Sequence, residues 1–368
     1  MWEERVEEWG PGLLEALKGI EDPRKPRGVR HPLPAILGGA RSLYAIAQWG
    51  REHPGMAQCL GFSRRQTPCV ATLHHLFRRL DVDAFESALS RWTQEFMGEG
   101  EATIAIDGKA LRGIHGEELT GVRLVAAYAR ESGLVVGQKG VKGHRKESEL
   151  GVAFSLLAEL DLRGKVVTGD ALYAQQELSR RVLEMGGDYF WVVKDNQPWV
   201  KEAVSLLFEK PPWGERFDEV VREGRHGDRW ERRRLWASTA LNQYLEWPGL
   251  GQVCCVERTR RRKGKETVER AYAITSLFPE RADAARLLEI WRGHWGIENQ
   301  VHWVRDVVFG EDHSQVRTGS APQLLAALRN LVMGLLRLTG VKSIAAALRR
   351  YGWKPWETLT LIGLSPDN

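Results

Sequence analysis

An alternation of short apolar strands and amphipathic helices between residues 103 and 194 most constrains the fold of this chain. Strands are predicted at residues 103–107, 165–170 and 189–194, a hairpin at 124–141, and helices at 147–162 and 175–187. Strands that are separated by a helix need a crossover connection and therefore run parallel. The pattern predicts an α/β layer with a parallel centre.

Two of these strands end in an acidic residue, Asp107 in AID and Asp170 in TGD. If the strands are neighbours, both carboxylates emerge at the carboxyl ends of adjacent parallel strands, where open α/β sheets place their ligands. Two like charges held there repel each other, and a bound divalent cation commonly neutralises this repulsion. Either Asp alone is more typical of an N-cap or a turn. The equivalent positions of the two favour a metal site.

A third acid lies in WRGHWGIENQVHWVRD, residues 291–306. On a straight α-helix, five side chains of this stretch recur at steps of three and four and share one stripe. They are Trp291, His294, Glu298, His302 and Arg305. An apolar stripe lies about 100° away and consists of Ile290, Ile297, Val301, Val304 and Val308. Taken by itself, Glu298 is more typical of an ion-paired surface residue.

Composition narrows the function classes. With 368 residues, the chain is long enough for two or three domains. It has no run of about 18 apolar residues, and its acidic start differs from a signal peptide, so we expect a cytoplasmic protein with no membrane partner. The four cysteines form no CxxC pair and no metal-ligand spacing, which argues against a disulfide scaffold and a zinc site.

Most of the positive charge lies in one segment. The chain carries a net charge of +5, and residues 213–270 hold 14 Lys and Arg against 10 Asp and Glu, a surplus of +4. The clusters RWERRR (229–234) and RTRRRKGK (258–265) fit contact with a phosphate backbone, or equally a solvated basic hairpin. Short alternating runs across residues 198–276 predict antiparallel strands.

The first 95 residues are predicted to be helical. Helical patterns at residues 43–53 and 71–80 flank a turn-rich stretch with the basic pair Arg64 and Arg65. The arrangement is compatible with a helix-turn-helix DNA reader, although a packing role is the commoner explanation. We therefore expect four regions: a helical N-terminal domain (1–95), the first part of an α/β core (96–197), a β-rich insertion (198–276), and the rest of the core with C-terminal helices (277–368).

Four segments together resemble a known family. AIDGKALRG, VVTGDALYAQ, FWVVKDNQ and HWGIENQVHWVRDVVFGEDHSQVR are similar to segments of the DDE transposases of bacterial insertion sequences, in the branch that includes H-repeat-associated proteins. The similarity runs in order over most of the chain. It implies a ribonuclease-H-like α/β fold, a mixed sheet flanked by helices, in which Asp107, Asp170 and Glu298 bind two Mg²⁺ or Mn²⁺ ions.

The resemblance also implies partners. They are double-stranded DNA, as transposon ends and target, and a second copy of the chain in a synaptic homodimer associated with the nucleoid. Candidate phosphate contacts, each equally a surface salt bridge, are Lys109, Arg112, Lys194, Arg292 and Arg305. Trp295 and Trp303 are candidates for stacking on an unpaired base, and His294 and His302 are further candidate DNA contacts.

Two features depart from the family pattern. The broader relatives carry a Tyr-x2-Arg-x3-Glu-x6-Lys signature, whose second position is occupied here by His294, with Arg292 beside it. Gly38 and Gly39 follow Leu37 where relatives continue an apolar stretch.

Three functions follow from this pattern. The leading hypothesis is a transposase that binds terminal inverted repeats and catalyses metal-dependent cleavage and strand transfer. The alternatives are a plain metal-dependent DNA nuclease and a catalytically inactive DNA-binding remnant. Asp306, Glu311 and Asp312 are rival third carboxylates, ranked lower because they lie off the stripe of Glu298 or beyond the helix.

Overall fold

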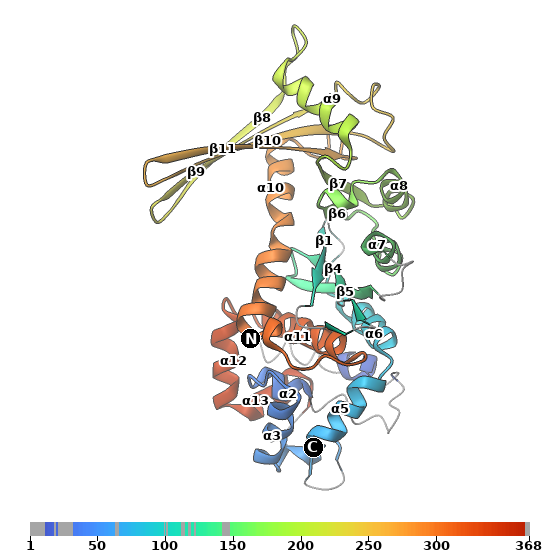
Figure 1. The fold of residues 1–368 in the computed structure, drawn as a ribbon, viewed down its shortest axis with the longest axis vertical. Coiled ribbons are helices and arrows are strands. Elements are labelled where there is room, and N and C mark those ends of the chain that lie inside the picture. Colours follow the sequence, from blue (N-terminus) through green and yellow to red (C-terminus); the bar gives the residue numbers. More distant parts are fainter. Residues whose placement is uncertain are drawn as a thin grey trace. The chain divides into compact units, whose positions relative to one another are not determined.

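The computed structural model describes residues 12–17, 20, 32–62, 66–98, 100, 102–111, 115–116, 119–120, 123–141 and 148–364. It is a mixed α/β structure with a large mixed sheet and flanking helices (Figure 1). The chain divides into two compact units. The first comprises Met1–Gly98, Gly108–Leu160 and Ile297–Asn368, and the second Glu99–Asp107 and Asp161–Gly296.

The second unit contains most of the sheet. Its strands follow the order β1-β6-β7-β11-β10-β9-β8. Their bounds are β1 (Thr103–Ala110), β6 (Val166–Gly169), β7 (Asp188–Val193), β8 (Asp218–His226), β9 (Arg229–Ser238), β10 (Gln252–Arg262) and β11 (Lys265–Thr275). The first three run parallel, as the helical crossovers predict, and the last four are antiparallel. The join between the two parts is the antiparallel pairing of β7 with β11.

Three helices of the second unit complete this layer. They are α8 (Gln176–Glu184), α9 (Pro198–Glu209) and α10 (Ala284–His294). Figure 1 shows α9 and α10 on opposite faces of strands β8–β11. On the α10 side, Leu287, Leu288 and Ile290 join the buried core that includes Val166 of β6 and Cys254 of β10. Burial of this apolar face holds α10 against the sheet.

The four strands predicted within residues 198–276 are present, but the segment begins with a helix. Pro198 occupies the first turn of α9, where its missing N–H costs no hydrogen bond. Val200, Val204 and Leu207 are buried at helical spacing. The alternation that predicts strands therefore starts only at β8, after the turn that follows α9.

The first unit combines a hairpin with helices. Strands β4 (Arg123–Ala129) and β5 (Leu134–Val141) pair as the predicted hairpin, and α7 (Glu149–Leu157) packs on both. The N-terminal helices are α2 (Pro32–Leu37), α3 (Leu43–Glu52), α4 (Met56–Cys59), α5 (Val70–Arg79) and α6 (Val82–Gln94). The C-terminal helices are α11 (Ala321–Leu338), α12 (Ile344–Trp353) and α13 (Pro355–Leu361).

Helix α11 forms the buried centre of the first unit. Every residue from Ala321 to Leu336 is buried, and the helix packs against β5, α6 and α2. A helix that is buried all round needs neighbours on every side, and its few buried polar side chains, Gln323, Arg329 and Asn330, are hydrogen-bonded. Among the described residues, however, no helix combines the length and the apolar character needed to cross a membrane.

Candidate active site

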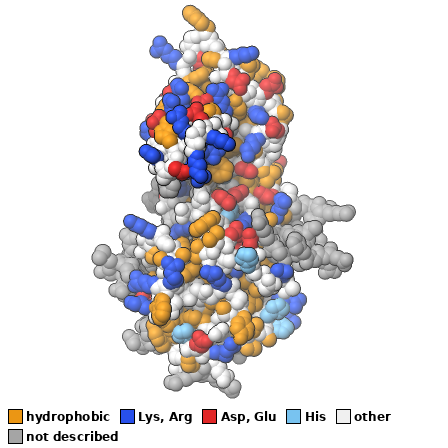
Figure 2. Space-filling model, turned by 60° about the vertical axis from the view of Figure 1, so that its left-hand side comes forward, with side chains coloured by type: hydrophobic (Ala, Val, Ile, Leu, Met, Phe, Trp, Pro, Cys, Tyr) orange, Lys and Arg blue, Asp and Glu red, His pale blue; other side chains and the backbone are white. Residues whose placement is uncertain are grey.

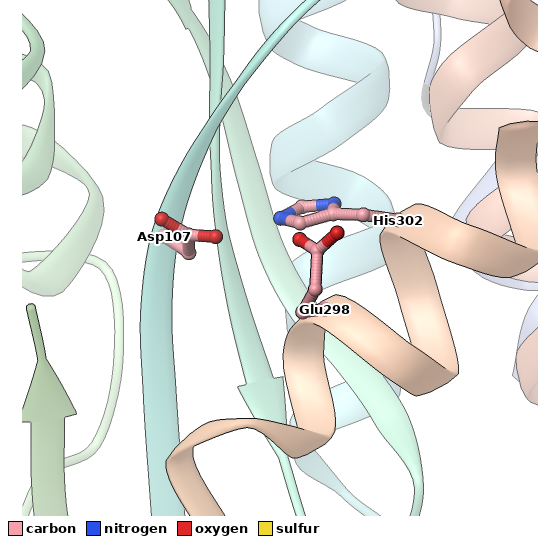
Figure 3. Close-up of side chains that lie close together, drawn as sticks. All are labelled: Asp107, Glu298 and His302. Carbon is pink, nitrogen blue, oxygen red and sulfur yellow. The ribbon is translucent and has the colours of Figure 1, made fainter. Parts of the chain in front are cut away.

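Asp107 and Asp170 lie at the same level on two neighbouring strands of the second unit. Strands β1 and β6 pair in parallel with Ala105 opposite Thr168, and the same register continued by two residues brings Asp107 level with Asp170. Asp107 projects from β1 (Figure 3), and both acids are half-buried. The predicted adjacency of these parallel strands is confirmed. The sheet therefore presents two carboxylates together at the carboxyl end of β6.

Asp170 also shapes the turn that follows β6. Its Oδ1 accepts a hydrogen bond from the backbone N–H of Leu172 at 2.9 Å and caps a short 3₁₀ turn. Gly169 makes this turn possible, because a Cβ atom there would lie 2.8 Å from Cβ of Tyr173 and 2.9 Å from the Trp191 ring. A carboxylate has two oxygens with several lone pairs, so capping and ligand binding are compatible. The turn fixes the carboxylate beside the strand end.

His294, at the end of α10, lies close to both acids. Its Nδ1 is 3.2 Å from Oγ1 of Thr168 on β6, and the ring is buried. Burial lowers the pKa of His294, although the charges of Asp107 and Asp170 act in the opposite direction. The imidazole is therefore neutral at pH 7. His294 anchors α10 to the sheet, and its burial argues against the predicted DNA contact.

Three other residues of the second unit that are predicted to contact DNA are accessible to solvent. Lys194, which follows β7, and Arg292, on α10, are exposed, and Trp295 is 56% exposed. Lys194 lies near enough to His294 to lower its pKa further. A positive charge beside two carboxylates suits the binding of an anionic substrate.

The segment that carries Glu298 in the first unit is π-helical. The turns Glu298–His302 and Val304–Val308 each close with an N–H to C=O bond between residues five apart, one from Trp303 to Glu298 and one from Phe309 to Val304. Such turns are rare and frequently lie at functional sites. Figure 3 shows Glu298 and His302 projecting from consecutive turns. A carboxylate oxygen of Glu298 and a ring nitrogen of His302 lie within 4.8 Å of each other.

The π turns break the straight helical stripe that the sequence predicts. Each wider turn accommodates an extra residue, so side chains that follow rotate around the axis. Glu298 is exposed and Trp303 is 52% exposed, whereas His302 is buried. The apolar stripe is buried throughout, as predicted. Trp303 therefore points outward, whereas His302, with a ring nitrogen within 4.8 Å of a carboxylate oxygen of Glu298, is enclosed.

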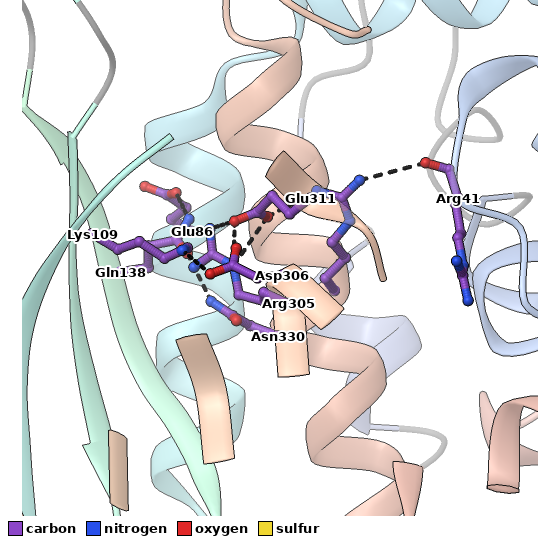
Figure 4. Close-up of polar contacts among 9 residues, drawn as sticks. Arg41, Glu86, Lys109, Gln138, Arg305, Asp306, Glu311 and Asn330 are labelled. Atoms are coloured by element: carbon purple, nitrogen blue, oxygen red, sulfur yellow. Dashed lines mark hydrogen bonds and ion pairs between the residues drawn. The ribbon is translucent and has the colours of Figure 1, made fainter. Parts of the chain in front are cut away.

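Arg305 is fully buried in an ion-pair cluster. Its guanidinium contacts Oε1 of Glu311 at 2.7 Å, and Arg329 contacts Oε2 at 2.8 Å (Figure 4). Burial by itself would raise the pKa of Glu311, but the two guanidinium charges outweigh burial and lower it. The predicted phosphate contact of Arg305 has no support in the structure, because the side chain is enclosed and paired.

The comparisons with known proteins identify the family. A model of the transposase DDE domain matches residues 98–335, and a model of the region associated with that domain matches residues 14–93. The chain belongs to the transposase DDE-domain family. The first model spans β1, β6 and the π-helical segment, and therefore all three predicted metal ligands.

Curated relatives of the DDE-domain family extend along most of the chain. YncI of Escherichia coli O157:H7 is 29% identical over 92% of this chain and 90% of its own length. The H repeat-associated protein YhhI of E. coli K12 is 26% identical over 92% and 93%. A protein from the dhlA 3′ region of Xanthobacter autotrophicus is 32% identical over 66% and 83%. A solved piggyBac transposase synaptic complex covers 98% of this chain and 78% of its own, but with a TM-score of 0.42 and 10% identity it carries no inference.

The remaining acids and bases near the DDE-domain motifs are engaged elsewhere. Lys109 donates to Asp306 at 2.6 Å, and only 11% of the lysine side chain is exposed (Figure 4). Asp306, one of the alternative third carboxylates, is therefore paired with Lys109. Glu311, another alternative, is paired with two arginines in the buried cluster. Arg112 lies outside the described residues. The predicted contact at Lys109 therefore requires the release of Asp306.

Sequence reasoning assigned His302 to DNA rather than to the acid beside it. The four-residue spacing from Glu298 was the available signal, since two ligand side chains one turn apart commonly share an ion. No sequence pattern indicates the role of the Thr168 hydroxyl, because its partner His294 lies 126 residues away in the sequence.

Proposed function

We propose that this protein is a DNA transposase that binds transposon ends and catalyses phosphodiester cleavage and strand transfer. Membership of the transposase DDE-domain family supports the reaction class. The single observation that carries the proposal is the parallel register of β1 and β6, which brings Asp107 level with Asp170. A pair of acids at this edge of a sheet is a suitable start for a divalent metal site.

Asp107, Asp170 and Glu298 are the proposed metal ligands. Their carboxylate oxygens suit Mg²⁺ or Mn²⁺, and no cysteine belongs to the group. These residues would hold two ions, which would supply charge stabilisation for the entering and leaving oxygens of an in-line displacement. Asp170 is pre-oriented by its bond to the Leu172 amide. The neutral His294 keeps α10 in place against β6 without adding positive charge beside the acids.

The exposed basic groups of the second unit have a proposed role in binding. Lys194 and Arg292 are accessible and contact backbone phosphates near the cleavage position. Trp295 offers an exposed ring on which an unpaired base stacks. These groups orient the substrate and take no part in proton transfer.

Loss of one ligand should abolish cleavage. We expect Asp107→Ala to lose Mn²⁺-dependent nicking of duplex DNA that carries the element's ends, by at least about a thousandfold, because charge stabilisation of the displaced oxygen is lost. Nicking is measured by gel with end-labelled DNA. Asp195→Asn is the matched control, since Asp195 is exposed and pairs only with Lys201 in the described residues.

The products distinguish the alternatives. Nicked DNA that is never joined to a target indicates a nuclease without strand transfer. DNA binding with no cleavage in any divalent metal indicates an inactive remnant. Unchanged nicking by Asp107→Ala would refute the assignment of this acid.

A further inference from the structure

The strands β8–β11 form a ladder whose side chains sort into two faces. In the pairing register, Val220, Leu235, Val256 and Ala271 lie side by side across the four strands. The first three belong to or pack on the core that contains Leu287 and Ile290 of α10. This set marks the face on the α10 side. The opposite face contacts α9, where Tyr272 donates to Glu209 at 3.3 Å.

Beyond the apolar set, the α10 side of the ladder becomes strongly basic. Successive rows across the strands lie two residues apart, about 7 Å along each strand. The charged members of the next three rows on this side are Arg222, Arg233, Arg258 and Glu269, then Glu231 and Arg260, then Arg229, Arg262 and Lys265. We call these seven basic residues the basic face. These three rows contain seven basic and two acidic residues, whereas the three rows that alternate with them on the other side contain five basic and three acidic ones.

Two rows place like charges directly opposite one another. Arg222, Arg233 and Arg258 occupy neighbouring positions on β8, β9 and β10. Like charges directly opposite each other on paired strands are destabilising. The outermost row repeats this arrangement on β9, β10 and β11 with its three basic residues. Carboxylates offset only part of this repulsion, Glu231 at Arg233 and Arg258 and Asp228 at Arg262, so a further anion over these rows would be stabilising.

The acids on this side neutralise only part of the charge. Glu231 pairs with Arg233 and with Arg258, and Glu269 pairs with Arg260. Within the described part of the chain, no carboxylate forms an ion pair with Arg222, Arg229 or Lys265. The uncompensated groups are exposed, so a large anion has access to them.

The positive charge continues from the strands onto α10. Burial lowers the pKa of Arg233, and the charges of Arg258 and Arg292 add to that effect against the pull of Glu231. Arg292 of α10 is therefore an electrostatic neighbour of the ladder. Arg292 precedes His294 by two residues, and His294 lies near Asp107 and Asp170, so the end of α10 carries positive charge near both Arg233 of the basic face and these acids.

A hollow on the basic face offers room for a ligand. Its volume is about 620 Å³, and it is lined by Arg229, Arg260, Arg262, Lys263 and Lys265 together with Thr267 and Glu269. Figure 2 shows Lys and Arg side chains, with acidic ones between them, gathered over the end of this sheet. An open basic hollow suits a linear polyanion better than a small compact one.

We infer that the basic face binds the sugar-phosphate backbone of duplex DNA and guides it toward the acids at the end of β6. That the ligand of the basic face is DNA rests on the proposed function. The position of the basic face on the ladder rests on the strand register. The contacts are to phosphates and carry no base specificity. Each contact releases counterions, so binding through this face depends strongly on salt.

The test removes three charges from the basic face. The variant Arg229→Gln/Arg262→Gln/Lys265→Gln is compared with Arg225→Gln/Arg232→Gln/Arg261→Gln, which removes three charges from the opposite side. Binding to a fluorescein-labelled 40-base-pair duplex of arbitrary sequence is measured in EDTA across salt concentrations. We expect the slope of log affinity against log salt to fall by up to about 2.7 for the first variant, at about 0.9 per contact, and to stay near wild type for the second.

The outcomes separate this inference from the proposed reaction. A wild-type slope in the basic-face variant, an equal fall in both variants, or no DNA binding by the wild type overturns the inference. Asp107→Ala should keep the wild-type slope, because the assay contains no metal. If circular dichroism shows that the triple variant does not fold, the single variants Arg229→Gln and Lys265→Gln replace it in the test. Each should reduce the slope of log affinity against log salt by about 0.9.

Discussion

Glu86 shows how one buried residue sets a pH dependence. Its carboxyl oxygens accept hydrogen bonds from Nε2 of Gln138 at 2.6 Å and of Gln323 at 2.9 Å. Asn330 in turn donates to Gln138 at 2.7 Å, and Figure 4 shows Glu86, Gln138 and Asn330 together. Burial raises the pKa of Glu86 to about 8, although both amide donors act against that rise. The folded protein therefore holds Glu86 protonated at neutral pH.

This residue should make stability fall as pH rises. The pKa of Glu86 is raised on folding, so its contribution is fully present below the unfolded value of 4.5 and is lost as pH rises toward about 8. Within that window, the loss is at most about 1.4 kcal/mol per pH unit. We expect Glu86→Gln to have a smaller decline between pH 5 and 8, measured by urea unfolding. An unchanged pH slope, matching the exposed control Glu202→Gln, would contradict this account.

At the scale of elements, the helical segment after α10 differs most from its prediction. The sequence predicts one straight helix with a polar and an apolar stripe. The apolar stripe is buried, but the polar stripe divides into an exposed Glu298 and a buried Arg305. Two π turns, Glu298–His302 and Val304–Val308, run through this part of the segment. A π turn needs only one hydrogen bond to move by one residue, so the spacing of apolar residues does not predict it.

The end of β6 is the element whose packing bears most directly on the site. We expect Gly169→Ala to destabilise the protein by about 1–3 kcal/mol, because its Cβ would overlap Tyr173 and Trp191 in a packed core. The same displacement should move Asp170 and reduce nicking. Chemical denaturation and the nicking assay measure the two effects. Gly224→Ala is the control, since nothing lies within 4 Å of a Cβ there; equal stability of the two variants would disprove this packing argument.

At the scale of the whole molecule, binding of a metal ion by the proposed ligands is linked to the stability of the fold. A metal ion that binds only the folded protein stabilises it by an amount that grows with the logarithm of the ion concentration once this exceeds the Kd. Metal binding is therefore measurable without DNA and without catalysis.

We expect saturating Mn²⁺ to raise the melting temperature of the wild type by about 2–5 °C. The rise should be absent in Asp107→Ala and in Glu298→Gln, and present in Glu202→Gln, which changes an exposed acid of α9. Differential scanning calorimetry with and without Mn²⁺ measures it. A full rise in both ligand variants would place the ion elsewhere.

The sequence by itself determined the parallel strands, the hairpin, the four antiparallel strands and the neighbouring positions of Asp107 and Asp170. Each follows from local periodicity together with the rule that helical crossovers join parallel strands. The proposed domain boundaries and the DNA-reading role of the N-terminal helices stay predictions. Only the tertiary structure decided that His294, His302 and Arg305 are buried and that seven basic residues share one face of the ladder. Burial and cross-strand pairing depend on partners that are distant in sequence, and no local pattern encodes them.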